Sequence, residues 1–207
     1  MFRKSIKQKI VGIAAGLIVL AVITSALSMI MAARVGHLLD ELTNRYVPAY
    51  GSLARVNVRS LERAVAVREM IIAKMENPPD QASYAAHQKT FESIDPEIER
   101  EAQAARKQIA AIIDDTSTPS DNAALGRLDD RIDTAINDLR GRLDEQGATL
   151  LKQLDARNFD EAKSTLVGAD ALRAEFDRKI DGIRNDMLNQ VRASATTVIR
   201  EQQQSQN

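Results

Sequence analysis

The sequence of 207 residues contains no cysteine, no tryptophan and only two histidines, and aromatic residues make up 3% of it. Without cysteine there is no disulfide framework, no thiol chemistry and no cysteine-based zinc site. The 28 lysines and arginines are balanced by 29 aspartates and glutamates. A nucleic-acid-binding protein needs a basic excess and stacking aromatics, so the composition excludes that class as well.

What the sequence has instead is a run of 24 uncharged residues from Ile10 to Ala33. As a helix this run would be ~36 Å long, and the hydrocarbon core of a membrane is ~30 Å thick. We therefore expect a transmembrane helix over residues 10–33. The segment before it, residues 1–9, carries four basic side chains and no acid. This charge predicts a cytoplasmic N-terminus at a bacterial inner membrane, with the rest of the chain periplasmic or extracellular.

Two features of this run have a second interpretation. A cleavable signal peptide also begins with basic residues, and Met31-Ala32-Ala33 resembles a cleavage site. Its apolar region has only ~7–15 residues, however, so the length favours an uncleaved anchor. Gly12 and Gly16 form a GxxxG pair, which either lets two spans approach closely or reflects the frequency of glycine in membrane helices.

Beyond the span, apolar residues recur at spacings of three and four, the pattern of helices that pack along a seam. The predicted helices cover residues 35–75, 81–113, 119–156 and 158–200. Pro48 should kink or break the first helix, whereas the apolar pattern keeps its phase across Pro96, so we expect one helix there. The seam predicted for the first helix comprises Leu39, Leu42, Tyr46, Tyr50, Leu53, Asn57, Leu61, Val65, Arg68, Ile72 and Met75.

Capping signals mark where the later helices begin. Asp80 follows two prolines and can cap the second helix. Thr118 is the expected cap of the third helix, with Pro119 as its first residue. Asn158 and Glu161 have the spacing of a capping box at the start of the fourth helix.

The helical pattern defines the fold class. No segment alternates as a strand does, so we expect an all-α protein. Short connections imply antiparallel neighbours, hence an N-terminal transmembrane helix that continues into an antiparallel up-down-up-down four-helix bundle. The bundle covers residues 34–203 and a polar tail covers residues 204–207. We expect the chain to be the N-terminal part of a longer receptor or a truncated reading frame; the alternative is a complete protein with a single anchor.

Over nearly its whole length the chain resembles the four-helix-bundle sensory, ligand-binding domain of bacterial methyl-accepting chemotaxis receptors. The resemblance lies in the basic N-terminus and span that run directly into the first helix, and in two stretches. These are NVRSLERAVAVREMII (residues 57–72) and LDARNFDEAKSTL (residues 154–166). The second span, linker helices and cytoplasmic signalling hairpin of that family lie outside this sequence.

The resemblance implies that a small solute, such as an organic acid or an amino acid, binds the bundle and shifts the fourth helix relative to the first. It also implies a parallel homodimer with the first helices at the interface. The first helix has apolar residues outside its predicted seam that could serve this contact. They are Val56, Val58, Val67 and Ile71.

Five residues are candidates for ligand binding. Asn57 and Arg68 lie on the seam of the first helix, where a buried arginine needs a partner. Counted along antiparallel helices, Arg68 is level with about residue 167, so Asp170 could pair with it and fix the register; the alternative is contact with an anionic ligand. Arg59 and Arg63 lie on a face that is solvated by default, or that meets a symmetry mate and holds an anion. Arg173 on the fourth helix is nearly level with Arg63.

Catalytic and metal-binding signals are absent from the sequence. It has no P-loop, dinucleotide-binding, HExxH, nucleophile-elbow or EF-hand motif. His37 lies near the predicted membrane and His87 far from it, so they cannot share a metal, and His87 is expected in the core. We therefore expect no enzyme, no cofactor and no metal site. Two functions remain: a membrane-anchored receptor input domain, and a structural or adaptor protein that binds no ligand.

Overall fold

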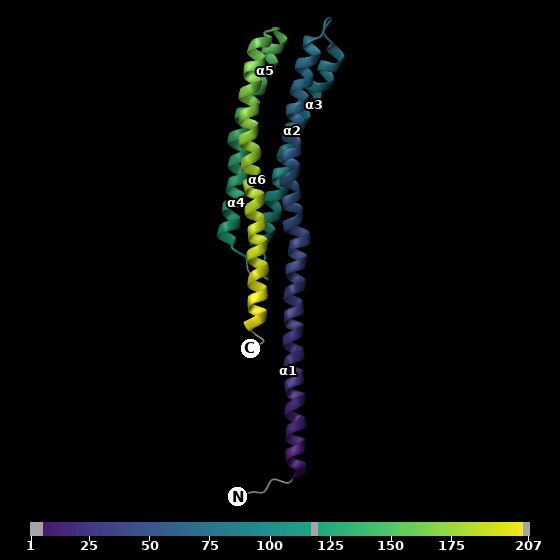
Figure 1. The fold of residues 1–207 in the computed structure, drawn as a ribbon, viewed down its shortest axis with the longest axis vertical. Helices are drawn as coiled ribbons and strands as arrows, with labels where there is room; N and C mark the ends of the chain where they lie inside the picture. Colours follow the sequence, from purple (N-terminus) through teal and green to yellow (C-terminus); the bar gives the residue numbers. More distant parts are fainter. Residues whose placement is uncertain (1–5, 117–119, 205–207) are drawn as a thin grey trace.

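The computed structural model describes residues 6–116 and 120–204, and these residues are almost entirely helical, with no strand among them. The chain begins with a long apolar helix (Figure 1). The elements are α1 (Ile6–Glu41), the π-helical segment η1 (Leu42–Tyr46), α2 (Val47–Met75), α3 (Gln81–Asp114), α4 (Asn122–Thr134), the π-helical segment η2 (Ala135–Leu139), α5 (Arg140–Asp155) and α6 (Phe159–Gln204). The all-helical class is therefore confirmed.

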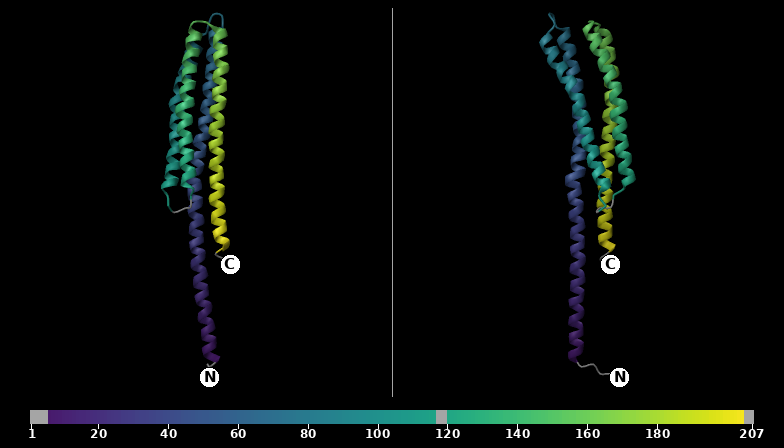
Figure 2. Two further views of the ribbon diagram at one scale, coloured as in Figure 1. Left: turned by 90° about the vertical axis from the view of Figure 1, so that its left-hand side faces the viewer. Right: turned by 180° about the vertical axis from the view of Figure 1, so that it is seen from behind.

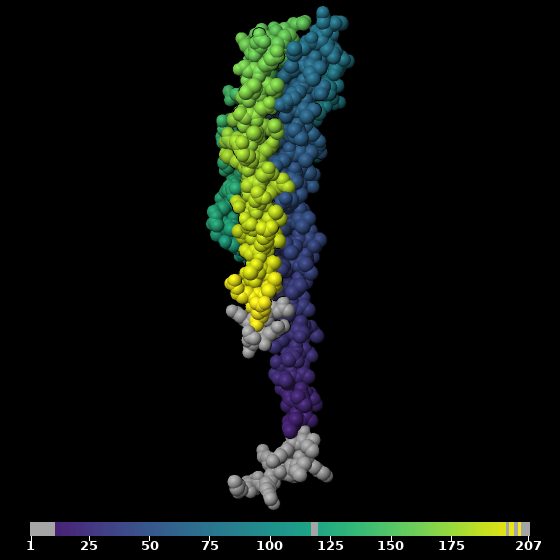
Figure 3. Space-filling model, in the orientation of Figure 1, coloured from purple at the N-terminus to yellow at the C-terminus, as the bar shows by residue number. Residues whose placement is uncertain are grey.

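The helices form four rods of unequal length. α1, η1 and α2 make one continuous rod, α3 returns beside α2, α4 and α5 form the third rod, and α6 descends beside α1 and α2 (Figures 1 and 2). The space-filling view shows α6 packed against α2 and the upper part of α1, while the lower part of α1 stands alone (Figure 3).

The isolated part of α1 is the apolar run. Within the described residues, the continuous helix formed by α1, η1 and α2 is the one long and apolar enough to cross a membrane by length and composition. Every side chain from Val11 to Ile30 is exposed. Protein packing therefore does not cover this apolar surface.

The disturbance predicted at Pro48 takes the form of a π-helical turn just before it, and the helix continues through it without ending. Pro48 lies in the first turn of α2, and Val47 donates its backbone N–H to the carbonyl of Leu42, five residues back. Proline has no N–H to donate and its ring crowds the preceding turn, so the chain widens into a π turn instead of continuing its α-helical pattern. A second π segment, η2, interrupts the third rod without a proline, and the sequence analysis did not anticipate it.

The predicted helix starts are confirmed in part. The Asp80 side chain accepts a hydrogen bond from the backbone N–H of Ser83, as a cap should. α3 continues through Pro96 as one helix. The predicted start of the third helix is wrong: α4 begins at Asn122, because Asp121 caps it by accepting from Ala124 N–H. Thr118 and Pro119 lie outside the described residues.

The fourth helix begins where the capping box predicts. α6 starts at Phe159, and Asn158 Nδ2 lies 3.3 Å from Glu161 Oε2. The backbone N–H of Ala162 bonds to the carbonyl of Asn158. Arg157 adopts a positive φ of 57°, which ends α5 and turns the chain toward α6.

The interior consists of two separate apolar clusters. The larger one occupies the half nearer the apolar part of α1 and includes Leu53, Ile109, Leu125 and Phe176. The smaller one occupies the distal half and includes Val67, Met70, Phe91 and Leu154.

The seam predicted for the first helix is correct from Leu42 to Leu53 and wrong on either side of this segment, where Leu39 is 57% exposed and its neighbour Leu38 is buried instead. Leu61, Val65, Ile72 and Met75 are about half exposed. The buried residues of α2 beyond Leu53 are instead Val56, Ser60, Arg63, Ala64, Ala66, Val67, Met70, Ile71 and Ala73. Many of these are small, so α3 can approach α2 closely, and the larger residues are left outside. Consequently Val56, Val67 and Ile71, expected to be free for a dimer contact, are buried, whereas Val58 is exposed.

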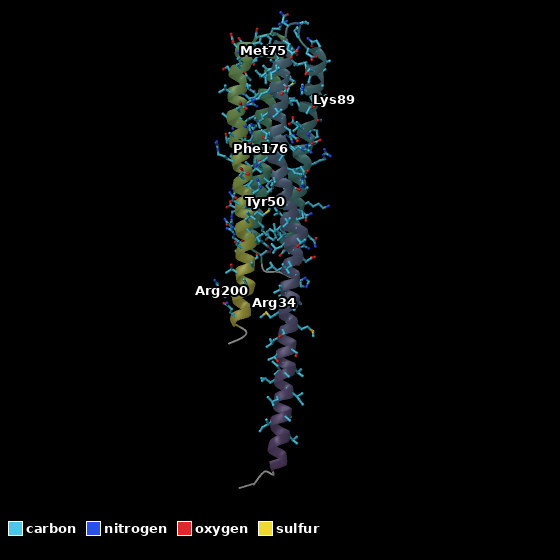
Figure 4. All side chains as sticks on the ribbon, turned by 45° about the vertical axis from the view of Figure 1, so that its right-hand side comes forward. Arg34, Tyr50, Met75, Lys89, Phe176 and Arg200 are labelled. Carbon is cyan, nitrogen blue, oxygen red and sulfur yellow. The ribbon has the colours of Figure 1, made fainter. Side chains whose placement is uncertain are left out.

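Side-chain pairs fix the register between α2 and α6. Asn57 bonds to Asp181 and Arg68 bonds to Asp170, so 11 residues along α2 match 11 residues in the opposite direction along α6. By this register Gln204 is level with Arg34, the first charged residue after the apolar run. Figure 4 shows Arg200 and Arg34 at similar heights on the two helices.

Candidate functional site

A cavity lies between the two apolar clusters. It is lined by residues of α2, α3, α5 and α6 and has a volume of about 50 Å³. Phe176 and Ile98 belong to the cluster nearer the apolar part of α1, and Phe91 and Leu150 belong to the distal one. Figure 4 shows Phe176 in the middle of the four rods. The cavity is thus an interruption in the core at which all four rods meet.

Arg63 is the most unusual residue of this cavity. It was expected on a solvated face, and that expectation is wrong, because only 7% of the residue is exposed. Its Nη2 bonds to Asp144 of α5 at 2.8 Å, and its Nε lies 3.2 Å from Asp95 of α3 without the alignment of a hydrogen bond. The guanidinium also lies over the ring of Phe91, 4.6 Å from its centre. Two carboxylates and an aromatic face compensate the burial of this charge.

Burial changes the pKa of one of these carboxylates. Desolvation raises the pKa of Asp95, with the charge of Asp144 adding to this effect and that of Arg63 opposing it. The two acids therefore compete for one buried arginine. Arg140 of α5 relieves this competition from the other side, since its Nη1 binds Glu99 at 2.6 Å and its Nε lies 3.8 Å from Asp144.

Arg173 reaches the same cavity from α6. This agrees with the prediction that Arg173 lies nearly level with Arg63 along the two helices. Its Nη1 bonds to Asp177 at 2.8 Å, and its Nε has no acceptor among the described residues. Burial raises the pKa of Asp177, while a hydrogen bond from Ser60 and the charge of Arg173 oppose the increase. Arg63 and Arg173 therefore lie at the same level, as predicted, although Arg63 is buried instead of solvated.

Arg68 forms the pair that the helix register predicted. Its Nη2 bonds to Asp170 at 2.7 Å, and its side chain is 43% exposed. Asp170 also lines the cavity, and its own side chain is 35% exposed. The cavity therefore approaches solvent between α2 and α6, at this ion pair.

The other two predicted residues lie outside the cavity. Asn57 donates to Asp181 at 2.7 Å, nearer the apolar part of α1. Arg59 bonds to Glu62 and pairs with Glu97 at 2.8 Å on an outer groove between α2 and α3. His87 lines this groove and is half-buried instead of lying in the core as expected.

Several cavity residues were not anticipated. Ser60, Arg140 and Gly147 line it together with the two phenylalanines. The sequence did contain a signal for Ser60. Leu53, Val56, Ser60, Ala64 and Val67 recur at helical spacing, as do the exposed seam residues Leu61, Val65, Ile72 and Met75. The second set was taken as the buried seam because its residues are larger.

Gly147 provides a test of how tightly the cavity is enclosed. A Cβ at Gly147 would lie 2.8 Å from Phe91 Cζ and 3.4 Å from Arg63 Nη2. We expect Gly147→Ala to lower the free energy of unfolding by up to about 2 kcal/mol, because overpacking outweighs the gain in helix propensity. Gly126→Ala is the control, since an added Cβ there meets no described atom within 4 Å. It should raise the free energy of unfolding by about 1 kcal/mol. If urea unfolding showed that both substitutions change the free energy of unfolding in the same direction, this packing would be contradicted.

The raised pKa of Asp177 predicts a pH dependence. Between its ordinary value of 3.8 and the raised value, the folded state binds more protons than the unfolded state, so this group's contribution to stability falls as pH rises. Asn cannot titrate, so the stability of Asp177→Asn relative to the unmodified chain should increase through this window and then level off. Urea unfolding of both chains from about pH 3 to about pH 7 measures the difference. A difference that decreased with pH would mean that Arg173 and Ser60 outweigh burial.

In the part of the chain that the structure describes, no group of three or more histidine, aspartate or glutamate side chains could hold a metal ion. Comparison of the chain with protein-family models, curated proteins and solved structures gives no match.

Proposed function

We propose that this chain is the membrane-anchored input domain of a chemotaxis-type receptor and that it binds a small organic solute in the cavity between the two apolar clusters. The observation that carries the proposal is the burial of Arg63 at that cavity, held by carboxylates from two other rods. A core that served only stability would do better with packed apolar residues there, since a buried ion pair contributes little to stability.

The location of the cavity suits signal transmission. Arg63 lies on α2, which is continuous with the apolar helix, and Arg173 lies on α6, which descends to the level of Arg34. In our proposal the four rods act as an antiparallel up-down-up-down bundle in the periplasm or outside the cell, with residues 10–33 in the inner membrane. A solute between α2 and α6 would change their relative position, and packed helices transmit such shifts because their packing is discrete.

We further propose that a second copy covers the outer stripe of α2. Its members are Val47, Val58, Leu61, Val65, Ile72 and Met75, all 49–64% exposed. The stripe lies on the same rod as the apolar helix, so two copies held in one membrane would present it to each other in parallel. This orientation and the restriction to a membrane favour a homodimer as the occupant.

A single cysteine tests the dimer, because the chain has none of its own. In membranes containing the full chain, Val65→Cys should give disulfide-linked dimers on mild oxidation, since like residues approach one another across a two-fold interface. Lys89→Cys, exposed on α3, is the control and should remain monomeric. Equal cross-linking of the two variants would contradict an interface on α2.

Solute binding is tested by thermal unfolding of the full chain in lipid nanodiscs with a panel of organic acids, amino acids and neutral solutes. At least one solute should raise the melting temperature of the unmodified chain. Ala169→Leu should abolish this increase, because Ala169 lines the cavity and leucine would fill it. Ala171→Leu, exposed on the same helix, should preserve the response. If no solute acts, or if Ala169→Leu responds normally, the receptor proposal fails and an adaptor without a ligand is favoured.

A further inference from the structure

The side chains that face the cavity carry an excess of positive charge. Arg63, Arg140 and Arg173 line it, and Asp170 is the one acid among the lining residues that the structure describes. One oxygen of Asp170 is already bound by Arg68. The other carboxylates that hold these arginines, such as Asp144, do not line the cavity.

Two hydrogen-bond donors of this cluster are unused. The Nε–H groups of Arg63 and Arg173 are buried and form no hydrogen bond within the described chain, although Arg63 Nε lies 3.2 Å from Asp95 Oδ1 in an ion pair. One other nitrogen of each arginine is engaged, since Arg63 Nη2 bonds to Asp144 and Arg173 Nη1 bonds to Asp177. An unmet buried donor of a charged group is costly, so an acceptor at this place would be favoured. A carboxylate suits both donors, because each of its oxygens accepts and neither donates.

A ligand with an ammonium group is disfavoured. Asp95 and Asp177 each have a buried oxygen without a hydrogen bond, but neither residue lines the cavity. An ammonium would therefore meet three arginines and an aspartate that is already paired, and like charges in a desolvated site repel strongly. This separates simple carboxylates from zwitterionic amino acids.

The remaining wall restricts size and polarity. The volume of about 50 Å³ is about a third of the ~150 Å³ of an apolar cavity that admits benzene. Apart from the charged groups and Ser60, the wall is apolar and includes Val67, Phe91, Leu150, Leu166 and Phe176. A methyl or ethyl group fits such surroundings, whereas a second charged or polar group does not.

We infer that the solute bound here is a short-chain monocarboxylate the size of acetate, with its carboxylate between Arg63 and Arg173 and its alkyl end against the apolar wall. This inference rests on the proposed function, because it names the class of solute for the same cavity. Small inorganic anions share the negative charge but lack the alkyl end, so the test includes nitrate, which is planar and similar in size to acetate.

The test is isothermal titration calorimetry of the full chain in nanodiscs at matched ionic strength, with acetate, acetamide, glycine and nitrate. Acetate should bind saturably. Acetamide, which lacks the charge, and glycine, which adds an ammonium, should each bind at least about tenfold more weakly. Nitrate should also be weaker than acetate, because it gains nothing from the apolar wall.

Two variants locate the binding. Arg173→Lys keeps the charge beside Asp177 but loses the Nε–H, so it should weaken acetate binding by about tenfold or more. Arg178→Lys, exposed on the same helix, should leave it unchanged. Ala169→Leu, which removes no charge, should abolish binding by filling the cavity.

Three results would overturn the inference: glycine or acetamide binding as tightly as acetate, nitrate binding as tightly as acetate, or acetate binding unaffected by both Arg173→Lys and Ala169→Leu. If acetate does not bind but another solute stabilises the unmodified chain and not Ala169→Leu, the carboxylate assignment is wrong while the proposed function stands. If no solute stabilises the unmodified chain in this way, both the carboxylate assignment and the proposed function fail.

Discussion

Replacing Arg63 by methionine is expected to lower the free energy of unfolding by ~3–5 kcal/mol, because Asp95 and Asp144 would lose their buried cationic partner. Arg63 is 7% exposed, whereas the side chains of Asp95 and Asp144 are 25% and 40% exposed, so water takes over part of the lost interaction and the loss is expected at the lower end of this range. The measurement is urea unfolding of the full chain in nanodiscs, followed by circular dichroism.

The matched control is Arg131→Met, which breaks the pair that Arg131 forms with Asp186. Both side chains of that pair are nearly half exposed, so the expected loss is at most ~1 kcal/mol. Equal losses for the two variants would mean that solvent reaches Arg63 and that the site is not the buried one described above.

The second large effect is expected from Phe176→Ala. Phe176 is 1% exposed, belongs to the larger apolar cluster and lines the cavity. Its truncation should lower the free energy of unfolding by ~3–5 kcal/mol, through lost burial and an enlarged void. The same urea unfolding measures it, and Val167→Ala is the control on α6.

Val167 is 70% exposed, so its truncation should change stability by no more than ~0.5 kcal/mol. A loss below ~1 kcal/mol for Phe176→Ala would indicate that α6 is not packed into the core at this level. The contrast between the two variants therefore tests whether α6 is an integral part of the interior.

The helical segments could be predicted because their signals are local. The spacing of apolar residues, the Asp80 cap and the disturbance before Pro48 each depend on a few neighbouring residues. The Arg68–Asp170 pair could be predicted as well, because the rise per residue fixes which positions of two antiparallel helices are level.

The buried face of α2 could not be predicted from its sequence alone. Beyond Leu53 the helix has two apolar stripes side by side, and the one with the larger residues, such as Leu61 and Val65, was taken as the seam. Close packing of α3 against the stripe of smaller residues decides which face of α2 is buried. That packing depends on the partner helix and not on α2 alone.

The burial of Arg63 is a long-range effect of the same kind. Its spacing from Arg55 and Arg59 is typical of a solvated face. Its actual partners lie 32 and 81 residues away, at Asp95 and Asp144. No local pattern joins these positions, so the candidate site became visible only when the rods were placed together.

The central claim is that a solute in the cavity moves α6 against α2, and disulfide formation between the two helices measures this most directly. Asn57 and Asp181 contact each other at 2.7 Å on the side of the cavity that faces α1, and the chain has no cysteine of its own to interfere with an Asn57→Cys/Asp181→Cys variant. In nanodiscs, saturating acetate should change the rate of disulfide formation several-fold, and adding Ala169→Leu should remove the effect. An unchanged rate at acetate concentrations that saturate the calorimetric signal would contradict the account.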